Sequence, residues 1–241
     1  MKRILKIVGL VVGVFVLGAV AVLAPAFLGR RAIIDGLEFN GIHIVKDGFV
    51  SVAVVPIGPH EVALIDAGND KSGRAILAEL SRRQLNPDAV TAILVTHGHP
   101  DHIGALALFP KAQVMALEPE VALVERGGAK VNRALKDGET VTLGQTPVRV
   151  FAVPGHTAGS AAYLVNGILF LGDAADVATD GKIKGSPWIF SASQAQDRAS
   201  LVALNQRLVK DGAAVKAIAF AHSGVLSEGL TPLTAFADKN Q

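Results

Sequence analysis

Three histidines and an aspartate lie within six consecutive positions of this chain, in the segment Thr96-His97-Gly98-His99-Pro100-Asp101-His102. Imidazole nitrogens and carboxylate oxygens are ligands of zinc and of other divalent metals. In an extended backbone residues i and i+2 point to the same side, so His97 and His99 can reach one ion together. Pro100 suits the first turn of a helix, from which Asp101 and His102 can face a second ion. The spacing therefore predicts a metal site.

Three more residues of ligand type follow predicted strands further along the chain. They are His156, Asp173 and His222. Several strands that each end in one ligand residue can aim these side chains into a single cavity, which makes this set, together with the upstream cluster, a candidate site. The remaining histidines, His43 and His60, fall outside the pattern, and we interpret them as surface or structural residues.

The segments between these residues alternate between short apolar strands and helical patterns. In the first half the pattern predicts a β-meander over 42–45, 50–57 and 62–65, a helix over 70–85, a strand over 90–95, a helical stretch from 102 to 109 and a strand over 114–117. In the second half it predicts strands over 140–143 and 148–153, a hairpin over 161–171 turned at Asn166-Gly167, a helix over 193–209 and a strand over 215–221. One sandwich-like α/β domain with helices outside explains these elements more economically than two domains.

With this order of ligand-type residues, the sequence resembles the metallo-β-lactamase superfamily, whose hallmark is a His-x-His-x-Asp-His motif followed by His, Asp and His. The resemblance covers about residues 40–225 and implies a four-layer αββα sandwich with a dinuclear site in a cleft at one edge. It implies two divalent metal ions, most commonly Zn²⁺, with iron or manganese as alternatives. By residue, it implies one metal on His97, His99 and His156, a second on Asp101, His102 and His222, and Asp173 between them.

The same resemblance implies a metal-dependent hydrolase in which a metal-bridging hydroxide attacks the substrate, with Asp101 both ligating and carrying a proton. Asp173 favours a glyoxalase II-like branch, because class B β-lactamases have Cys or Ser at the corresponding place. We therefore expect cleavage of carboxylic ester, thioester or lactone bonds in a small-molecule substrate. A β-lactam hydrolase, a mononuclear iron persulfide dioxygenase and a metal-binding protein without activity are the alternatives. Asp66, after a predicted strand, would either support a ligand or be a plain turn residue.

Two departures leave the substrate open within this branch. Only 19 residues follow His222, which leaves no room for the helical glutathione-binding domain of glyoxalase II. The single tyrosine, Tyr163, precedes Asp173, whereas many acyl-homoserine lactonases have a tyrosine after it.

The segment 174–193 follows Asp173 directly, so we expect it to cross the mouth of the cleft. Trp188, Ile189 and Phe190 could form an apolar wall there, and Lys182 or Lys184 could meet an anionic group. The alternative is a packed loop with solvated lysines.

The chain contains no cysteine, which excludes disulfide scaffolds, thiolate metal clusters and cysteine nucleophiles. Its net charge of +2 is unevenly placed, because residues 1–31 contain five basic and no acidic side chains. The body that follows is mildly acidic. No nucleic-acid partner is therefore expected, and the sequence gives no indication of the oligomeric state.

Between Lys6 and Arg30 lie 23 uncharged residues, enough to cross a bilayer once as a helix. We therefore predict an N-terminal transmembrane or signal helix over 1–31, preceding a catalytic domain over 32–241. A retained anchor fits the length better than a cleaved signal peptide, and a buried soluble helix is the third alternative. The predicted location is membrane-anchored or exported, with the catalytic domain outside the cytoplasm.

Overall fold

The computed structural model describes residues 28–241. The predicted membrane or signal segment falls almost entirely on the residues before these, and so lies outside the described part of the chain. Within residues 28–241 no helix is both long and apolar enough to span a bilayer.

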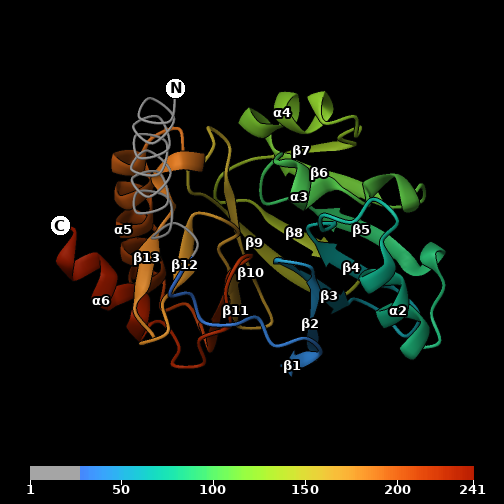
Figure 1. Ribbon diagram of the computed structural model, residues 1–241, viewed down its shortest axis with the longest axis horizontal. Coiled ribbons are helices and arrows are strands. Elements are labelled where there is room, and N and C mark those ends of the chain that lie inside the picture. The colour runs from blue at the N-terminus through green and yellow to red at the C-terminus, as the bar shows by residue number, and fades with distance from the viewer. Residues whose placement is uncertain (1–27) are drawn as a thin grey trace, which may run out of the picture.

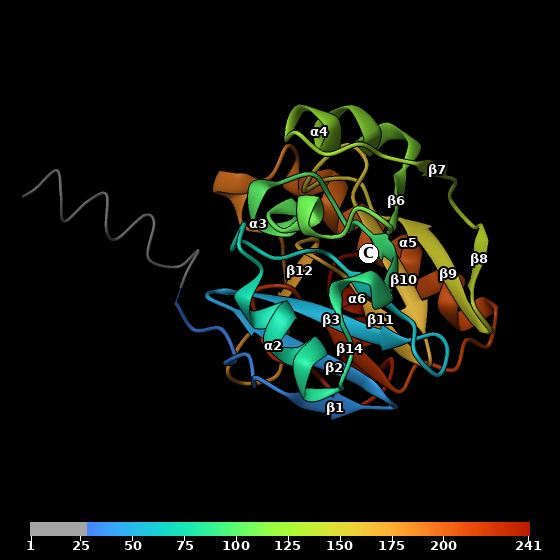
Figure 2. The same cartoon turned by 90° about the vertical axis from the view of Figure 1, so that its right-hand side faces the viewer.

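The first sheet has seven strands in the sequential order β1 to β7, namely β1 (Leu37–Phe39), β2 (Ile42–Asp47), β3 (Val50–Pro56), β4 (Val62–Ile65), β5 (Val90–Leu94), β6 (Gln113–Leu117) and β7 (Arg133–Leu135). Strands β1 to β4 pair antiparallel, which confirms the predicted meander. Strands β4 to β7 pair parallel, and the segments that connect them run over the outer face of the sheet (Figure 2). The carboxyl ends of β4 and β5 therefore lie side by side.

The second sheet has the order β14-β11-β10-β9-β8, with β8 (Thr140–Leu143), β9 (Thr146–Ala152), β10 (Ala161–Val165), β11 (Ile168–Phe170) and β14 (Ala217–Ala219). The predicted hairpin turn joins β10 to β11, and both of its residues have positive φ, 49° at Asn166 and 78° at Gly167. That backbone is the one an Asn-Gly turn favours in a two-residue hairpin. A separate two-stranded hairpin consists of β12 (Ala175–Val177) and β13 (Ile183–Gly185).

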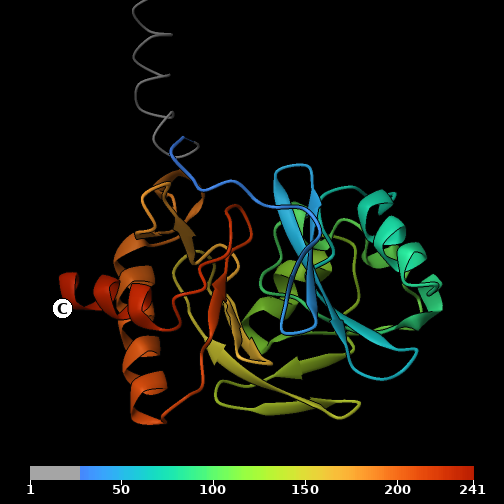
Figure 3. The ribbon, with the colours of Figure 1, turned by 90° about the horizontal axis from the view of Figure 1, so that it is seen from below.

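Helices cover the outer face of each sheet, so the layers run helix, sheet, sheet, helix (Figures 1 and 3). The helices are α2 (Arg74–Arg82), α3 (Pro100–Ile103) and α4 (Val121–Arg126) over the first sheet, and α5 (Gln194–Lys210) and α6 (Thr231–Lys239) over the second; the 3₁₀ turns are η1 (Pro87–Ala89), η2 (Leu106–Leu108), η3 (Glu118–Glu120) and η4 (Trp188–Phe190).

Three apolar clusters correspond to the three contacts between these layers. Leu94 and Tyr163 belong to the core between the sheets. Ile76 of α2 packs on the outer face of the first sheet, and Leu204 of α5 packs on that of the second. The predicted αββα sandwich is therefore confirmed for the described residues.

Several element boundaries differ from the prediction. The helix expected over 70–85 is limited to α2, because Gly73 before it has a left-handed φ of 58°. The helical stretch expected to residue 109 divides into α3 and η2, and the last strand is only the three residues of β14. Strands β1, β7, β12 and β13 and helix α4 were not predicted, because such short elements carry too few residues for a clear hydrophobic period. Helix α6 was not predicted either.

Candidate metal centre

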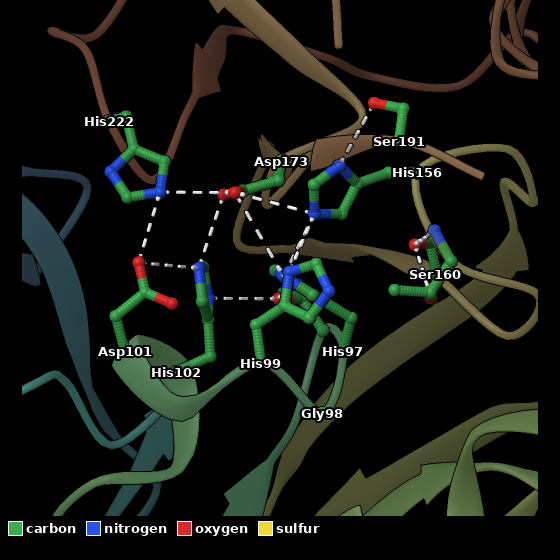
Figure 4. Close-up of polar contacts among 12 residues, drawn as sticks. His97, Gly98, His99, Asp101, His102, His156, Ser160, Asp173, Ser191 and His222 are labelled. Atoms are coloured by element: carbon green, nitrogen blue, oxygen red, sulfur yellow. Dashed lines mark hydrogen bonds and ion pairs between the residues drawn. The ribbon is translucent and has the colours of Figure 1, made fainter. Parts of the chain in front are cut away.

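All seven predicted ligand residues meet at one edge of the sandwich, where the two sheets expose the ends of their strands (Figure 4). The histidine cluster occupies the loop after β5 and the start of α3, with Pro100 at the first position of that helix as expected. His156 lies on the loop between β9 and β10, Asp173 follows β11, and His222 follows β14. Both sheets thus contribute side chains to a single site.

Three imidazole nitrogens face one another in the first group of ligands. His97 Nε2 lies 3.0 Å from His99 Nδ1 and 3.1 Å from His156 Nε2, and the last two nitrogens are 3.0 Å apart. A neutral imidazole nitrogen either donates or accepts, so three such nitrogens cannot all be satisfied by bonds among themselves. Asp173 Oδ2 lies 3.5 Å from His156 Nε2 on the open side. These four donors converge as ligands around one cation do.

The second group contains Asp101, His102 and His222. His222 Nε2 lies 3.3 Å from Asp101 Oδ2 and 3.0 Å from Asp173 Oδ2. His102 Nε2 is 3.2 Å from Asp173 Oδ1, yet both of these buried atoms lack a hydrogen-bond partner. A buried polar atom without a hydrogen-bond partner normally destabilises the folded state. Two such atoms that face each other therefore fit a site where a cation binds between them. Asp173 contacts both groups.

The histidines of the first group are held neutral. Burial lowers the pKa of His97 well below its ordinary value, lowers that of His156 to about 4, and also lowers that of His99. Neutral imidazole is the form that binds a metal, so this group needs no loss of protons in order to bind one.

The second group is a network of opposite charges. Burial alone would lower the pKa of His102 and of His222, but Asp173 outweighs it, together with Asp66 at His102 and Asp101 at His222. The pKa of His102 is therefore well above its ordinary value and that of His222 is about 10. Burial would also raise the pKa of Asp173, but the same two histidines hold it well below its ordinary value. For Asp101, too, burial would raise the pKa, but the hydrogen bond with His222 and the charge of His102 lower it. Both carboxylates are thus ionised, as metal ligands must be.

Asp66 supports His102 from behind, which decides between the two interpretations of this residue. Its Oδ2 accepts a hydrogen bond from His102 Nδ1 at 2.8 Å, while its Oδ1 accepts one from the backbone N–H of Thr96 at 2.7 Å. The side chain is buried and the backbone has a left-handed φ of 61°. With Nδ1 occupied in this way, His102 presents Nε2 to the site.

Glu120 is a functional candidate that the sequence patterns do not single out. Its buried carboxylate accepts hydrogen bonds from the backbone N–H of Gly98 at 2.8 Å, from Thr157 Oγ1 at 2.8 Å and from the backbone N–H of Gly159 at 2.9 Å. Gly98 stands between two ligands and Thr157 follows a third. The one sequence signal is an acidic residue shortly after a buried strand, which is too common to mark a functional residue.

An open cleft of about 890 Å³ borders the second group of ligands, with Asp101, Asp173 and His222 on its wall. The aromatic ring of Phe49, from the turn between β2 and β3, stacks on the His222 ring with 5.6 Å between ring centroids. The Phe49 carbonyl also accepts a hydrogen bond from His222 Nδ1 at 3.1 Å. The cleft is thus wide enough for a small molecule that reaches the candidate ligands.

The family model of the metallo-beta-lactamase superfamily matches residues 45–219, the stretch that contains six of the seven candidate ligands. The chain belongs to the metallo-β-lactamase superfamily. It is 33% identical over 153 residues to a hydroxyacylglutathione hydrolase of Vibrio cholerae serotype O1, covering 61% of this chain and 54% of that protein. A hydroxyacylglutathione hydrolase of Edwardsiella ictaluri is 27% identical over 150 residues, covering 61% and 55%. The chain thus spans little more than half the length of these relatives.

Solved structures of the superfamily share the fold. A subclass B3 metallo-beta-lactamase of Bradyrhizobium japonicum superposes with a TM-score of 0.63 at 22% identity, covering 89% of this chain and 93% of that one. A metallo-beta-lactamase family protein of Thermus thermophilus gives a TM-score of 0.62 at 24% identity, covering 84% and 80%. At these identities the likeness concerns the fold alone.

The residues that line the cleft differ from those that the sequence predicted. Of the expected apolar residues, Phe190 lines the cleft, whereas Trp188 and Ile189 are exposed and do not line it. The expected cations, Lys182 and Lys184, do not line the cleft either. Its basic lining residues are Arg30, Arg31 and Lys46. The reason is that residues 29–31 pair with the β12–β13 hairpin and so place two arginines at the cleft.

Three residues, two of the histidines and the tyrosine, lie outside the metallo-β-lactamase motif and are not among the candidate ligands. His43 lies 3.2 Å from Glu38 and 3.1 Å from Glu79 and belongs to neither group of candidate ligands, and His60 is exposed in a surface turn. Tyr163 is buried between the sheets, and its hydroxyl donates to the Val95 carbonyl at 2.7 Å. The expected structural roles of the two histidines are consistent with these positions, and Tyr163 does not face the cleft.

Proposed function

We propose that this chain is a metal-dependent hydrolase that cleaves carboxylic ester, thioester or lactone bonds. The observation that carries the proposal is the position of Asp173, whose carboxylate faces both groups of candidate ligands. Two divalent cations held by these groups, with Zn²⁺ the first candidate, would polarise a substrate carbonyl and bring the pKa of a bound water near neutrality.

In this proposal the residues of the site have different roles. The buried neutral histidines of the first group offer lone pairs, while Asp101 and Asp173 supply the negative charge that balances the cations. Asp101 is half-buried on the cleft wall, with Oδ2 3.3 Å from His222 Nε2. It can accept a proton at this oxygen and pass it to a leaving group in the cleft. Arg31 and Lys46 would attract a substrate that carries a carboxylate.

The similarity to hydroxyacylglutathione hydrolases supports ester-type chemistry, and so does the aspartate at position 173. β-Lactam hydrolysis is the second candidate. The basic lining of the cleft, which suits a substrate carboxylate, favours it.

Elemental analysis combined with a substrate panel tests the proposal. We expect close to two metal ions per chain, and turnover of at least one lactone, thioester or ester that is lost with a chelator and restored by Zn²⁺. His97→Ala and Asp101→Ala should abolish turnover without unfolding the domain, whereas the exposed His60→Ala should retain it. Turnover of β-lactams alone would favour the second candidate. A single iron with oxygen uptake on a persulfide would overturn both in favour of a dioxygenase, and a chain without stoichiometric metal would contradict the mechanism.

A further inference from the structure

Large apolar side chains are exposed next to the mouth of the cleft. Leu28, Phe49, Trp188 and Ile189 are 66%, 58%, 53% and 38% exposed, and we call these four residues the apolar rim. Leu28 and Trp188 border one shallow hollow, and that hollow shares Arg30 and Pro187 with the catalytic cleft. Phe49 lines the cleft itself. The rim and the cleft mouth therefore form one continuous surface.

Hydrogen bonds fix the backbone on both sides of η4, the 3₁₀ turn that carries Trp188 and Ile189. Before the turn, Asp197 Oδ2 accepts the backbone N–H of Ser186 at 3.0 Å. After it, Ser191 Oγ donates to the Pro187 carbonyl at 2.7 Å, and the Ala192 N–H donates to the His156 carbonyl. Trp188 and Ile189 are thus presented outward by a fixed backbone. Large exposed apolar side chains gathered around the mouth of one cleft indicate an interaction surface.

The chain enters the described domain at this same surface. The Thr179 N–H donates to the Gly29 carbonyl at 3.0 Å, and the Arg31 N–H donates to the Val177 carbonyl at 2.9 Å. Figure 3 shows the segment after residue 28 running from the β12–β13 hairpin to the edge formed by β2 and β3. Ile33 on the cleft wall follows Leu28 by five positions, a span of at most about 18 Å.

The residues that precede Leu28 identify the partner. The uncharged run 7–29, predicted to enter a bilayer, ends at the rim. Basic side chains also surround the rim, with Lys184 exposed beside Leu28 and Trp188, and Lys46 exposed beside Phe49. Tryptophan is enriched at membrane interfaces, and lysine near the surface is attracted to anionic lipid headgroups.

We propose that the apolar rim docks on the surface of a lipid bilayer, with the mouth of the cleft beside it. The site would then meet molecules that partition into the membrane interface, in addition to those dissolved in water. This inference concerns binding and does not depend on which bond the cleft hydrolyses.

Trp188 makes the proposal measurable, because it is the single tryptophan of the chain. The full chain is mixed with phosphatidylcholine vesicles that contain phosphatidylglycerol, and the vesicles are recovered by flotation. We expect a blue shift of the emission on binding, a loss of intensity with lipids brominated near the headgroup, and reduced quenching by iodide. Failure of the chain to float with the vesicles, or floating chain whose tryptophan is reached by iodide but not by brominated lipid, would overturn the proposal.

A matched pair of variants distinguishes docking through the apolar rim from nonspecific hydrophobic binding to the vesicles. Ile189→Asp places a charge in the rim and should abolish quenching by brominated lipid. Val209→Asp changes an apolar residue that is more exposed than Ile189 and lies at the far end of α5, about 25 Å away along the 17-residue helix, and should leave quenching unchanged. Equal quenching in both variants would contradict docking through the rim. A blue shift without lipid quenching that grows with protein concentration would instead indicate a second copy on the rim.

Discussion

Glu120 Oε1 accepts a hydrogen bond from the backbone N–H of Gly98 at 2.8 Å, across 22 positions of sequence. The other carboxylate oxygen accepts from Thr157 Oγ1 and from the Gly159 N–H. One buried side chain therefore joins the loop that carries His97 and His99 to the loop that carries His156. It fixes the distance between ligands that the sequence places 57 or more positions apart.

Glu120→Gln should weaken metal binding at the first group of ligands. The amide nitrogen cannot accept the N–H groups that the carboxylate accepts, so at least one loop would be released. We expect a loss of 10- to 100-fold in affinity for Zn²⁺, measured by competition with a chromophoric chelator, and a stability loss of about 1–3 kcal/mol. The control is Glu118→Gln, an exposed residue of the same 3₁₀ turn. Equal zinc affinities in the two variants would show that Glu120 has no role in positioning.

Asp66→Asn should disturb the second group of ligands. Asp66 fixes His102 by accepting a hydrogen bond from Nδ1. An asparagine amide could instead donate to Nδ1, which would favour the tautomer with the proton on Nε2, the nitrogen that faces the site. We expect one of the two metal sites to lose at least about 10-fold in affinity, which calorimetric titration of the metal-free protein would resolve. Asp88→Asn, at an exposed ion pair with Lys111, serves as the control. Two sites of unchanged affinity would refute this role.

Lys46→Ala should discriminate between anionic and neutral substrates of the proposed hydrolase. Lys46 is exposed on the cleft wall, so its attraction to a substrate carboxylate is worth about 0.2–1 kcal/mol, or roughly 1.5- to 5-fold in KM. The effect should vanish at high salt and for a neutral ester with the same leaving group. Steady-state kinetics of Lys46→Ala beside Lys111→Ala tests this. The same change in KM for both esters would exclude a charge effect.

Asp197 should make the protein less stable as the pH rises. Burial raises its pKa from 3.8 to about 6, against the hydrogen bond from the Ser186 N–H. Between these values the folded state keeps a proton that the unfolded chain has released, so the free energy of unfolding falls as the pH increases from about 4 to about 6. The full loss of stability, about 3 kcal/mol, is present above that range.

Asp197→Asn removes this ionisation while keeping an oxygen for Ser186. In urea unfolding we expect the variant to match the parent near pH 4 and to exceed it in stability by roughly 2–3 kcal/mol at pH 7.5. The exposed Asp238→Asn should give a constant difference over the same range. If the variant is destabilised by the same amount at every pH, ionisation of Asp197 does not lower the free energy of unfolding, and the prediction is wrong.

The sequence by itself determined which residues form the site. The cluster from His97 to His102 lies on a strand end and a helix start, and these local conformations fix the direction of neighbouring side chains. The other three ligand residues were marked by their places after predicted strands, and the family resemblance supplied their division between two metals and the order of the layers. Asp173 was thus assigned to the site from its place in the order of ligand residues along the chain.

Only the tertiary structure decided how these residues are held and what surrounds them. Glu120 and Arg31 act across contacts between segments distant in sequence, and no local pattern distinguishes a buried glutamate that joins two loops from a solvated one. Trp188 was expected in the cleft wall but stands outside it, because hydrogen bonds from the Ser186 N–H to the Asp197 carboxylate and from the Ser191 hydroxyl to the Pro187 carbonyl fix the backbone on either side of η4. Hydrogen bonds between polar side chains and the backbone set such orientations, and hydrophobic periodicity does not record them.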